Sequence, residues 1–342
     1  MNISHLIRRT TSHIDDNGEL SEGEAHELCS AILDGGIPDL ELGALLTAIG
    51  LNEKSPAELL GYYRAVAQRL NTLRAPVARP RPMVIPTYGG TRIEHNLLPL
   101  LGLLLRRLGV PVLFHGTLEA NGRVTCAYIL RELGILPSAT IAQAQAALDE
   151  DLMAFVPIAA LSPALATLLG LRHRLGIENI GHSVVQLIDP FEEQAVRLAS
   201  ADTDAGLDKL ASVLSASGLS DLLLNGTEGE PFADPRQRPQ IEWVSPSERT
   251  VLFAAEPNPM KAPTGLPSSN DAHATAGWIR QALAGTTPIP HPLVNELACC
   301  LYATGYTDDM NQAKAIAAVE TGSLGSVGRR ESHRAMLTDR LA

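Results

Sequence analysis

The stretch Pro86-Thr-Tyr-Gly-Gly-Thr-Arg-Ile-Glu-His-Asn96 joins a short apolar run to a long helical pattern. Met83-Val-Ile85 before it predicts a buried strand, and Leu97–Leu108 after it predicts a helix. A strand, a glycine turn and a helix in this order are typical of a loop that holds a phosphate, because amides at a helix N-terminus attract anions. A glycine pair also marks ordinary turns, so a turn without a ligand is an equal alternative.

Strands and helices keep alternating after this stretch. Val110–Phe114, which ends in His115-Gly116, and Leu152–Pro157 are apolar runs of strand length, and Thr125–Leu133 between them has a helical pattern. Two further helices are predicted near the end of the chain, over 292–304 and 310–321. This alternation favours an α/β fold with a mainly parallel sheet, whose ligands bind at the carboxyl ends of the strands.

The first seventy residues have the pattern of a small helical domain. Ser21-Glu-Gly-Glu24 is a capping box that predicts a helix start, a second helix is predicted near Asp39, and Ser55-Pro-Ala-Glu58 predicts a third. The proline-rich segment 75–82 cannot continue a helix and predicts an extended linker. The sequence therefore predicts a helical domain linked to an α/β domain.

Composition restricts the class of protein. The chain has 342 residues, 45% of them hydrophobic, which is enough for one large core and a smaller one. Its four cysteines, Cys29, Cys126, Cys299 and Cys300, contain no C-x-x-C spacing, so we expect packed thiols in a reducing compartment and neither disulfides nor a zinc site. The sequence contains neither a secretory h-region nor an apolar run of membrane-spanning length. We expect a soluble, cytoplasmic protein with no membrane partner.

The charges are distributed unevenly along the chain. The net charge is -11, yet residues 61–131 contain ten arginines against two acids, whereas residues 1–60 contain three basic residues against eleven acids. Such an asymmetry concerns binding partners and not the fold. Arginine also outnumbers lysine 23 to 4, and genome composition is an equal explanation of that excess.

Several segments resemble the anthranilate phosphoribosyltransferases and their relatives, the nucleoside phosphorylases of glycosyltransferase family 3. Tyr88-Gly-Gly90 stands where that family has its GTGGD phosphate loop, and Gly109–Gly116 is similar to the strand before its second phosphate loop. Segments 39–48, 54–61, 171–177 and 295–305 resemble helices of the same family. The resemblance implies a helical domain over residues 1–77 with a return near 158–188, and an α/β domain over 78–157 and 189–342.

The departures from that family concern its catalytic groups. Thr91 replaces the aspartate of the first loop, and Leu98 and Pro99 replace a serine and a threonine. The lysine, serines and aspartate of the second loop are replaced by Arg123, Val124, Thr125, Cys126 and Tyr128. Pro231-Phe232 stands at the place of the acid pair that holds magnesium in the enzymes. Because phosphoribosyl transfer needs a metal and donors around the departing pyrophosphate, the transferase interpretation is weak.

The chain resembles instead the divergent YbiB-like branch of the family, with Gly226-Thr-Glu-Gly-Glu230 and the stretch that ends in Asp189-Pro-Phe191. That resemblance implies a homodimeric, non-catalytic protein that binds single-stranded DNA or RNA without sequence preference. It implies no cofactor, no metal and no catalytic residue. Two alternatives stay open: a pentosyltransferase acting with magnesium and phosphoribosyl pyrophosphate in tryptophan biosynthesis, and a scaffold for a protein partner.

Candidate nucleic-acid or phosphate contacts come from the glycine turn, the arginine clusters and the second loop. They are Gly89, Gly90, Arg92, Asn96, Arg106, Arg107, His115, Arg123, Arg172 and Arg174. Arg106-Arg107 and Arg172-His173-Arg174 are equally well explained as solvated helix ends, and His115 as a structural histidine. Glu228 and Glu230 could bind a metal, but two carboxylates alone are an unspecific signal. Aromatic residues make up only 4% of the chain, so recognition would rest on phosphate charge.

Overall fold

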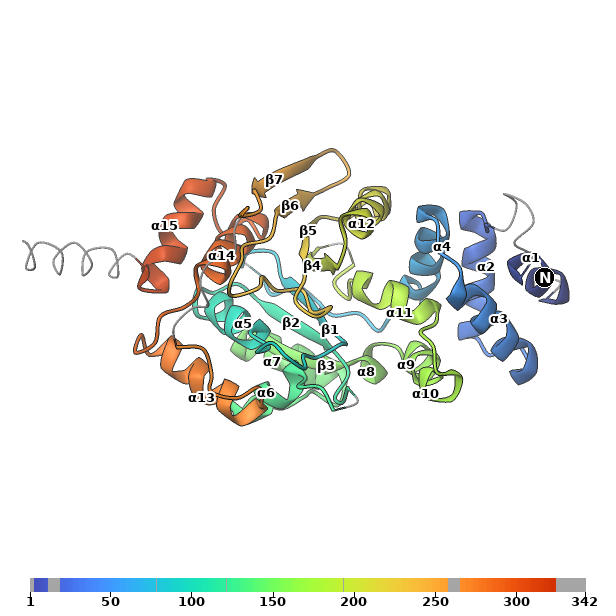
Figure 1. The fold of residues 1–342 in the computed structure, drawn as a ribbon, viewed down its shortest axis with the longest axis horizontal. Helices are drawn as coiled ribbons and strands as arrows, with labels where there is room; N and C mark the ends of the chain where they lie inside the picture. The colour runs from blue at the N-terminus through green and yellow to red at the C-terminus, as the bar shows by residue number, and fades with distance from the viewer. Residues whose placement is uncertain are drawn as a thin grey trace, which may run out of the picture.

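The computed structural model describes residues 3–11, 19–77, 79–120, 122–192, 194–257 and 265–323. It consists of a small helical part and a larger α/β part built on one sheet (Figure 1). The predicted fold class, a small helical domain with a larger, mainly parallel α/β domain, is therefore confirmed. The exact boundaries of the two domains stay a prediction.

The helical part begins with four helices: α1 (Ile3–Thr11), α2 (Glu22–Leu33), α3 (Asp39–Leu51) and α4 (Pro56–Ala67). Both predicted capping boxes form, with Ser21 and Glu24 at α2 and Ser55 and Glu58 at α4. The chain returns here after the third strand and adds α8 (Ile158–Leu161), α9 (Pro163–Gly170), α10 (Arg172–Leu175), α11 (Ile180–Val184) and the 3-10 turn η1 (Val185–Leu187). α9 packs on α2, and α11 packs on α3 and α4.

The sheet has seven strands in the order β3-β2-β1-β4-β5-β6-β7. Their bounds are β1 (Met83–Thr87), β2 (Val112–Gly116), β3 (Met153–Pro157), β4 (Val196–Ala201), β5 (Asp221–Asn225), β6 (Ile241–Val244) and β7 (Arg249–Phe253). β1 to β5 pair in parallel, whereas β6 and β7 extend the sheet antiparallel at one edge. The sequence patterns did not predict this antiparallel edge.

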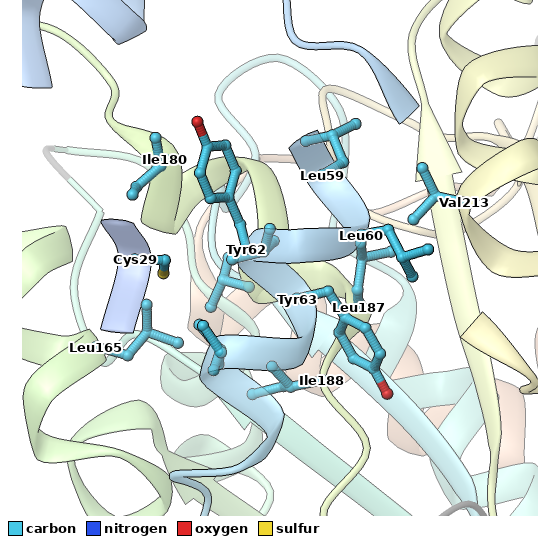
Figure 2. Packing of buried hydrophobic residues seen from close by; sticks show 14 of the residues in the cluster. Cys29, Leu59, Leu60, Tyr62, Tyr63, Leu165, Ile180, Leu187, Ile188 and Val213 are labelled. Carbon is cyan, nitrogen blue, oxygen red and sulfur yellow. The ribbon is translucent and has the colours of Figure 1, made fainter. Parts of the chain in front are cut away.

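Helices cover both faces of the sheet. They are α5 (Leu98–Arg107), α6 (Cys126–Glu132), α7 (Ile141–Asp151), α12 (Asp204–Ser217), α13 (Ala272–Leu283), α14 (His291–Ala303) and α15 (Met310–Glu320). One apolar cluster contains residues of α5, α6, α13 and α14, and a second runs from the helical part to the other face of the sheet. In Figure 2, Tyr62 of α4 lies on the side of Cys29 and Ile180, and Tyr63 lies on the side of Leu187. The two parts of the molecule therefore share a core.

The cysteines are packed as composition predicts. All four are buried and free, which confirms the expectation of packed thiols without disulfides. Among the described residues, no helix combines the length and the apolar character needed to cross a membrane.

A buried ion pair lies where the two parts meet. Arg197 of β4 and Asp221 of β5 are register partners, with side chains 1% and 0% exposed. The guanidinium donates from Nε to Asp221 Oδ1 at 2.5 Å and from Nη2 to Oδ2 at 2.8 Å. Its third nitrogen donates to the carbonyl of Leu187 in η1, and its central carbon lies 5.6 Å from the ring centre of Tyr63 in α4. One arginine therefore contacts the sheet and the helical part.

We expect Asp221→Ala to lower the free energy of unfolding by about 3–5 kcal/mol, because it leaves Arg197 buried without its counter-ion. Urea denaturation measures this. Asp208→Ala is the matched control, since it removes a 70% exposed partner of Arg249 and should cost less than about 1 kcal/mol. Equal losses in the two variants would contradict the structural role of the buried pair.

Candidate functional site at the glycine loop

The glycine loop follows β1 at the carboxyl edge of the sheet, as the sequence predicts. Thr91 in this loop exchanges two backbone hydrogen bonds with Val124 of the loop that follows β2, at 3.0 and 2.8 Å. Gly90 has a φ of +60°, and a Cβ on it would lie 3.0 Å from the carbonyl oxygen of Val124. Glycine is therefore required by both the backbone conformation and the close approach of the second loop.

The amides of the two loop glycines point at a carboxylate of the chain itself. Gly89 and Gly90 donate to Glu230 Oε1 at 2.7 and 2.6 Å. Glu230 belongs to the segment after β5 and is fully buried. Burial raises the pKa of its carboxyl group, whereas the two amides oppose that shift by stabilising the charged form. The amides of Gly89 and Gly90 therefore already have an acceptor within the chain.

Glu228 accepts from three further amides of the loop, which follow Thr91. Arg92 donates to its Oε2 at 2.8 Å, and Ile93 and Glu94 donate to its Oε1 at 2.8 and 2.6 Å. Arg123 Nη2 donates to the same carboxylate at 3.0 Å. Burial alone would raise the pKa of Glu228, but the three amides and Arg123 outweigh it and hold the pKa below its ordinary value.

A tight turn presents these two carboxylates. Thr227 and Glu230 exchange two backbone hydrogen bonds, of 2.9 and 3.0 Å, around Glu228 and Gly229. Both central residues have positive φ, +52° and +84°, the pattern of a type I′ turn. Asparagine and glycine favour such turns, and a glutamate in this conformation carries backbone strain. The side-chain bonds of Glu228 offset that strain.

Pro231 and Phe232, which the resemblance sets at the place of the family's magnesium-binding acid pair, carry no acid group. Phe232 is fully buried in the core, and Pro231 has no side-chain oxygen, so the residues present do not fit a magnesium ion. Ala233 after them donates to Glu296 of α14 at 2.9 Å. Among the described residues, no group of three or more histidine, cysteine or acidic residues could hold a metal.

His115 and Asn96 are buried beside the loop. The structure places His115 inside β2 and not in the loop after it, with Nδ1 2.8 Å from the hydroxyl oxygen of Tyr88. Burial and the nearby charge of Arg197 lower the pKa of His115 to about 3, so the ring is neutral at physiological pH. Asn96 Oδ1 accepts from the amide of Leu98 at 3.3 Å, which forms a local Asx-type turn just before α5.

Buried side-chain polar atoms without a hydrogen-bond partner gather at this edge of the sheet. They include Thr91 Oγ1, Asn96 Nδ2, His115 Nε2, Arg123 Nε and Ser200 Oγ. Most buried polar groups in proteins are paired, so such a cluster marks a functional site or its remnant. The carboxyl ends of the strands are therefore the candidate site, as the sequence predicts.

The structure separates the predicted basic residues into two groups. Arg106 and Arg107 end α5 at the opposite edge of the sheet, where Arg106 bonds Asp151 just before β3 and Arg107 bonds Glu320 of α15. They therefore lie apart from the glycine loop. Arg172 and Arg174 lie exposed in α10, in the segment that follows the carboxyl end of β3. Arg172 is 48% exposed and pairs with Glu178 at 3.1 Å.

Acids nearby in space neutralise much of the basic segment. At least five of its ten arginines form ion pairs, namely Arg64, Arg69, Arg106, Arg107 and Arg123. The cluster of positive charge along the sequence is therefore not a continuous basic surface. Glu228 and Glu230 are the residues that sequence reasoning missed, because it weighed them only as metal ligands. The sequence signal that could have revealed them is Glu228-Gly229, because a glutamate is unusual before glycine in a two-residue turn.

The fold, a small helical domain joined to a larger domain with a mainly parallel sheet, is that of the anthranilate phosphoribosyltransferases. Residues 4–70 match the family described as glycosyl transferase family, helical bundle domain. The protein YbiB of Escherichia coli K12 is 39% identical over 300 residues, which cover 87% of this chain and 92% of that protein. The chain belongs to the YbiB-like divergent branch of the anthranilate phosphoribosyltransferase and glycosyltransferase family 3 proteins.

More distant relatives agree with this family. An anthranilate phosphoribosyltransferase of Synechococcus sp. WH7803 is 27% identical over 95% of each chain. The crystal structure of anthranilate phosphoribosyltransferase from Thermus thermophilus superposes with a TM-score of 0.76 over 94% of each chain at 22% identity, which shows a common fold.

Glu296 beside the site makes stability depend on pH. Burial raises the pKa of its carboxyl group from 4.5 to about 8, so between these values the folded state keeps a proton that the unfolded state has lost. Stability therefore falls as pH rises through this window, by up to about 1.36 kcal/mol per pH unit. Glu296→Gln should remove that slope in urea denaturation at pH 5 to pH 8. Glu248→Gln, at an exposed position, is the control. If both variants keep the same dependence of unfolding free energy on pH as the wild type, the role assigned to Glu296 is contradicted.

Proposed function

We propose that the protein binds single-stranded nucleic acid without sequence preference, and without catalysing phosphoribosyl transfer, on the scaffold of an anthranilate phosphoribosyltransferase. The observation that carries this proposal is the occupation of the phosphate-type loop by the carboxylates of Glu228 and Glu230. A pyrophosphate group would need the amides that these side chains already hold. It would also meet two acids where the enzymes of the family place a metal and donors.

Exposed cations at the carboxyl edge support binding of a longer polyanion. The side chain of Arg92 is exposed beside the loop, and Arg172 and Arg174 are exposed in α10. Because β1, β2 and β3 are parallel, the loops after them and the segment that continues into α10 leave the sheet at the same edge. A nucleic-acid backbone crossing this edge would meet these side chains without entering the filled loop.

The alternative, a pentosyltransferase with magnesium and phosphoribosyl pyrophosphate, draws its support from the common fold with the enzymes. Phe232 at the place of the metal-binding acids, and the filled loop, oppose it. Turnover of anthranilate above background by the wild-type protein, with magnesium and phosphoribosyl pyrophosphate present, would reinstate it.

A homodimer is part of the proposal. Leu40 and Leu51, at the two ends of α3, are 82% and 74% exposed. Exposed apolar side chains that lie together on one surface often mark a contact with another protein. The same surface of a second copy would cover them in a two-fold contact. Analytical ultracentrifugation of the wild type should give twice the 36.4 kDa chain mass, and a monomer at micromolar concentration would contradict it.

We expect the double variant Arg172→Ala, Arg174→Ala to weaken binding of a labelled single-stranded oligonucleotide in fluorescence anisotropy. It should also flatten the dependence of log K on log salt, by about 0.7 for each phosphate that the variant no longer neutralises.

Arg106→Ala with Arg107→Ala is the matched control, since it removes the same charge from the opposite edge of the sheet. Its salt slope should equal that of the wild type. A larger loss in the control than in the α10 variant would place the contact surface elsewhere. No binding by the wild type at low salt would end the nucleic-acid proposal.

A further inference from the structure

Five amides of one loop converge on two side chains. Those of Gly89 and Gly90 bond Glu230, and those of Arg92, Ile93 and Glu94 bond Glu228, at 2.6 to 2.8 Å throughout. We call these five amides the amide nest. They form two neighbouring groups, separated by Thr91, whose amide bonds the carbonyl of Val124. Groups of neighbouring backbone amides that point at one acceptor hold phosphate oxygens in many proteins. Here two carboxylates supply the oxygens.

We propose that the turn Thr227–Glu230 is a built-in occupant of the amide nest, and that the nest binds a free phosphate or pyrophosphate anion once the side chain of Glu228 is removed. The exposed side chain of Arg92 lies beside both the amide nest and the proposed nucleic-acid contacts, but this proposal does not depend on nucleic-acid binding.

The backbone of the turn explains why Glu228 acts as a ligand and not as a turn former. Its φ of +52° disfavours a glutamate, and Gly229 follows with a φ of +84°. An asparagine before that glycine would suit the turn better. The glutamate offers instead a side chain long enough to reach three amides of another loop. Its identity is therefore explained by the contact across the site.

The charges around Glu228 favour an anion in its place. Arg123 donates both to the carboxylate of Glu228, at 3.0 Å, and to its backbone carbonyl, at 3.2 Å. The side chain of Arg92 is exposed beside the same amides. Glu94 is paired with Arg236. Without the Glu228 carboxylate, the three amides lose their acceptor and Arg123 keeps only the backbone carbonyl of residue 228, which costs free energy unless an anion enters.

A free anion cannot compete in the wild type. The carboxylates are tethered to the nest, so their effective concentration exceeds that of an ordinary solute. They also repel a second anion. Glu230 stays buried on Gly89 and Gly90 when Glu228 is replaced, and burial raises the pKa of Glu230, which weakens the remaining repulsion.

Isothermal titration calorimetry with inorganic pyrophosphate tests the proposal, with EDTA present so that no metal takes part. Glu228→Asn removes the long carboxylate and keeps a residue that suits the positive φ. We expect it to bind pyrophosphate at least about tenfold more tightly than the wild type, since one charge-assisted hydrogen bond gained is enough for that factor. Adding Arg123→Ala should remove most of the gain.

Glu192→Asn is the matched control, because Glu192 is an exposed glutamate with a φ of +53° outside the site. It makes the same change of charge and should bind no better than the wild type. A folded Glu228→Asn variant, with the circular dichroism and melting behaviour of the wild type, that gains no pyrophosphate binding would overturn the proposal. Equal binding by the wild type would overturn it as well. Failure of oligonucleotide binding alone would leave this result unchanged and would remove only the proposed function.

Discussion

The buried ion pair between Arg197 and Asp221 is the interaction on which the arrangement of the two parts depends. Desolvating two charges is costly, and only paired geometry with further hydrogen bonds compensates for it. Here the guanidinium is held by two carboxylate oxygens, the carbonyl of Leu187 and the ring of Tyr63. The pair therefore fixes β4 against β5 in the sheet and fixes both strands against the helical part.

The position of β5 in turn decides what the glycine loop can bind. Asp221 begins this strand, Asn225 ends it, and the turn with Glu228 and Glu230 follows directly. The turn brings its carboxylates onto the amides that follow β1, two strands away in the sheet. In this fold, which is shared with a phosphoribosyltransferase, carboxylates of the chain itself accept the hydrogen bonds of the loop amides. Acids that a substrate-binding site would exclude are stable here because five amides and Arg123 surround them.

Sequence reasoning succeeded where local chemistry decides structure. The capping boxes at Ser21 and Ser55, the strand before the glycine turn and the parallel sheet all follow from local patterns of capping residues and apolar spacing. It did not reach contacts between distant segments. Glu228 meets Glu94 across 134 positions, and Arg107 meets Glu320 across 213, so neither pairing leaves a periodic signal. The ten arginines of residues 61–131 give that segment an excess of positive charge in the sequence, yet acids from other parts of the chain form ion pairs with at least five of them.

Amide hydrogen exchange of the wild-type protein tests the internal occupation of the loop most directly. We predict slow exchange at Gly89, Gly90, Arg92, Ile93 and Glu94 without any ligand, because each of these amides already has a carboxylate acceptor. Inorganic pyrophosphate should leave those rates unchanged. Fast exchange in the free protein, slowed when pyrophosphate is added, would show an open phosphate site and contradict occupation of the loop by Glu228 and Glu230.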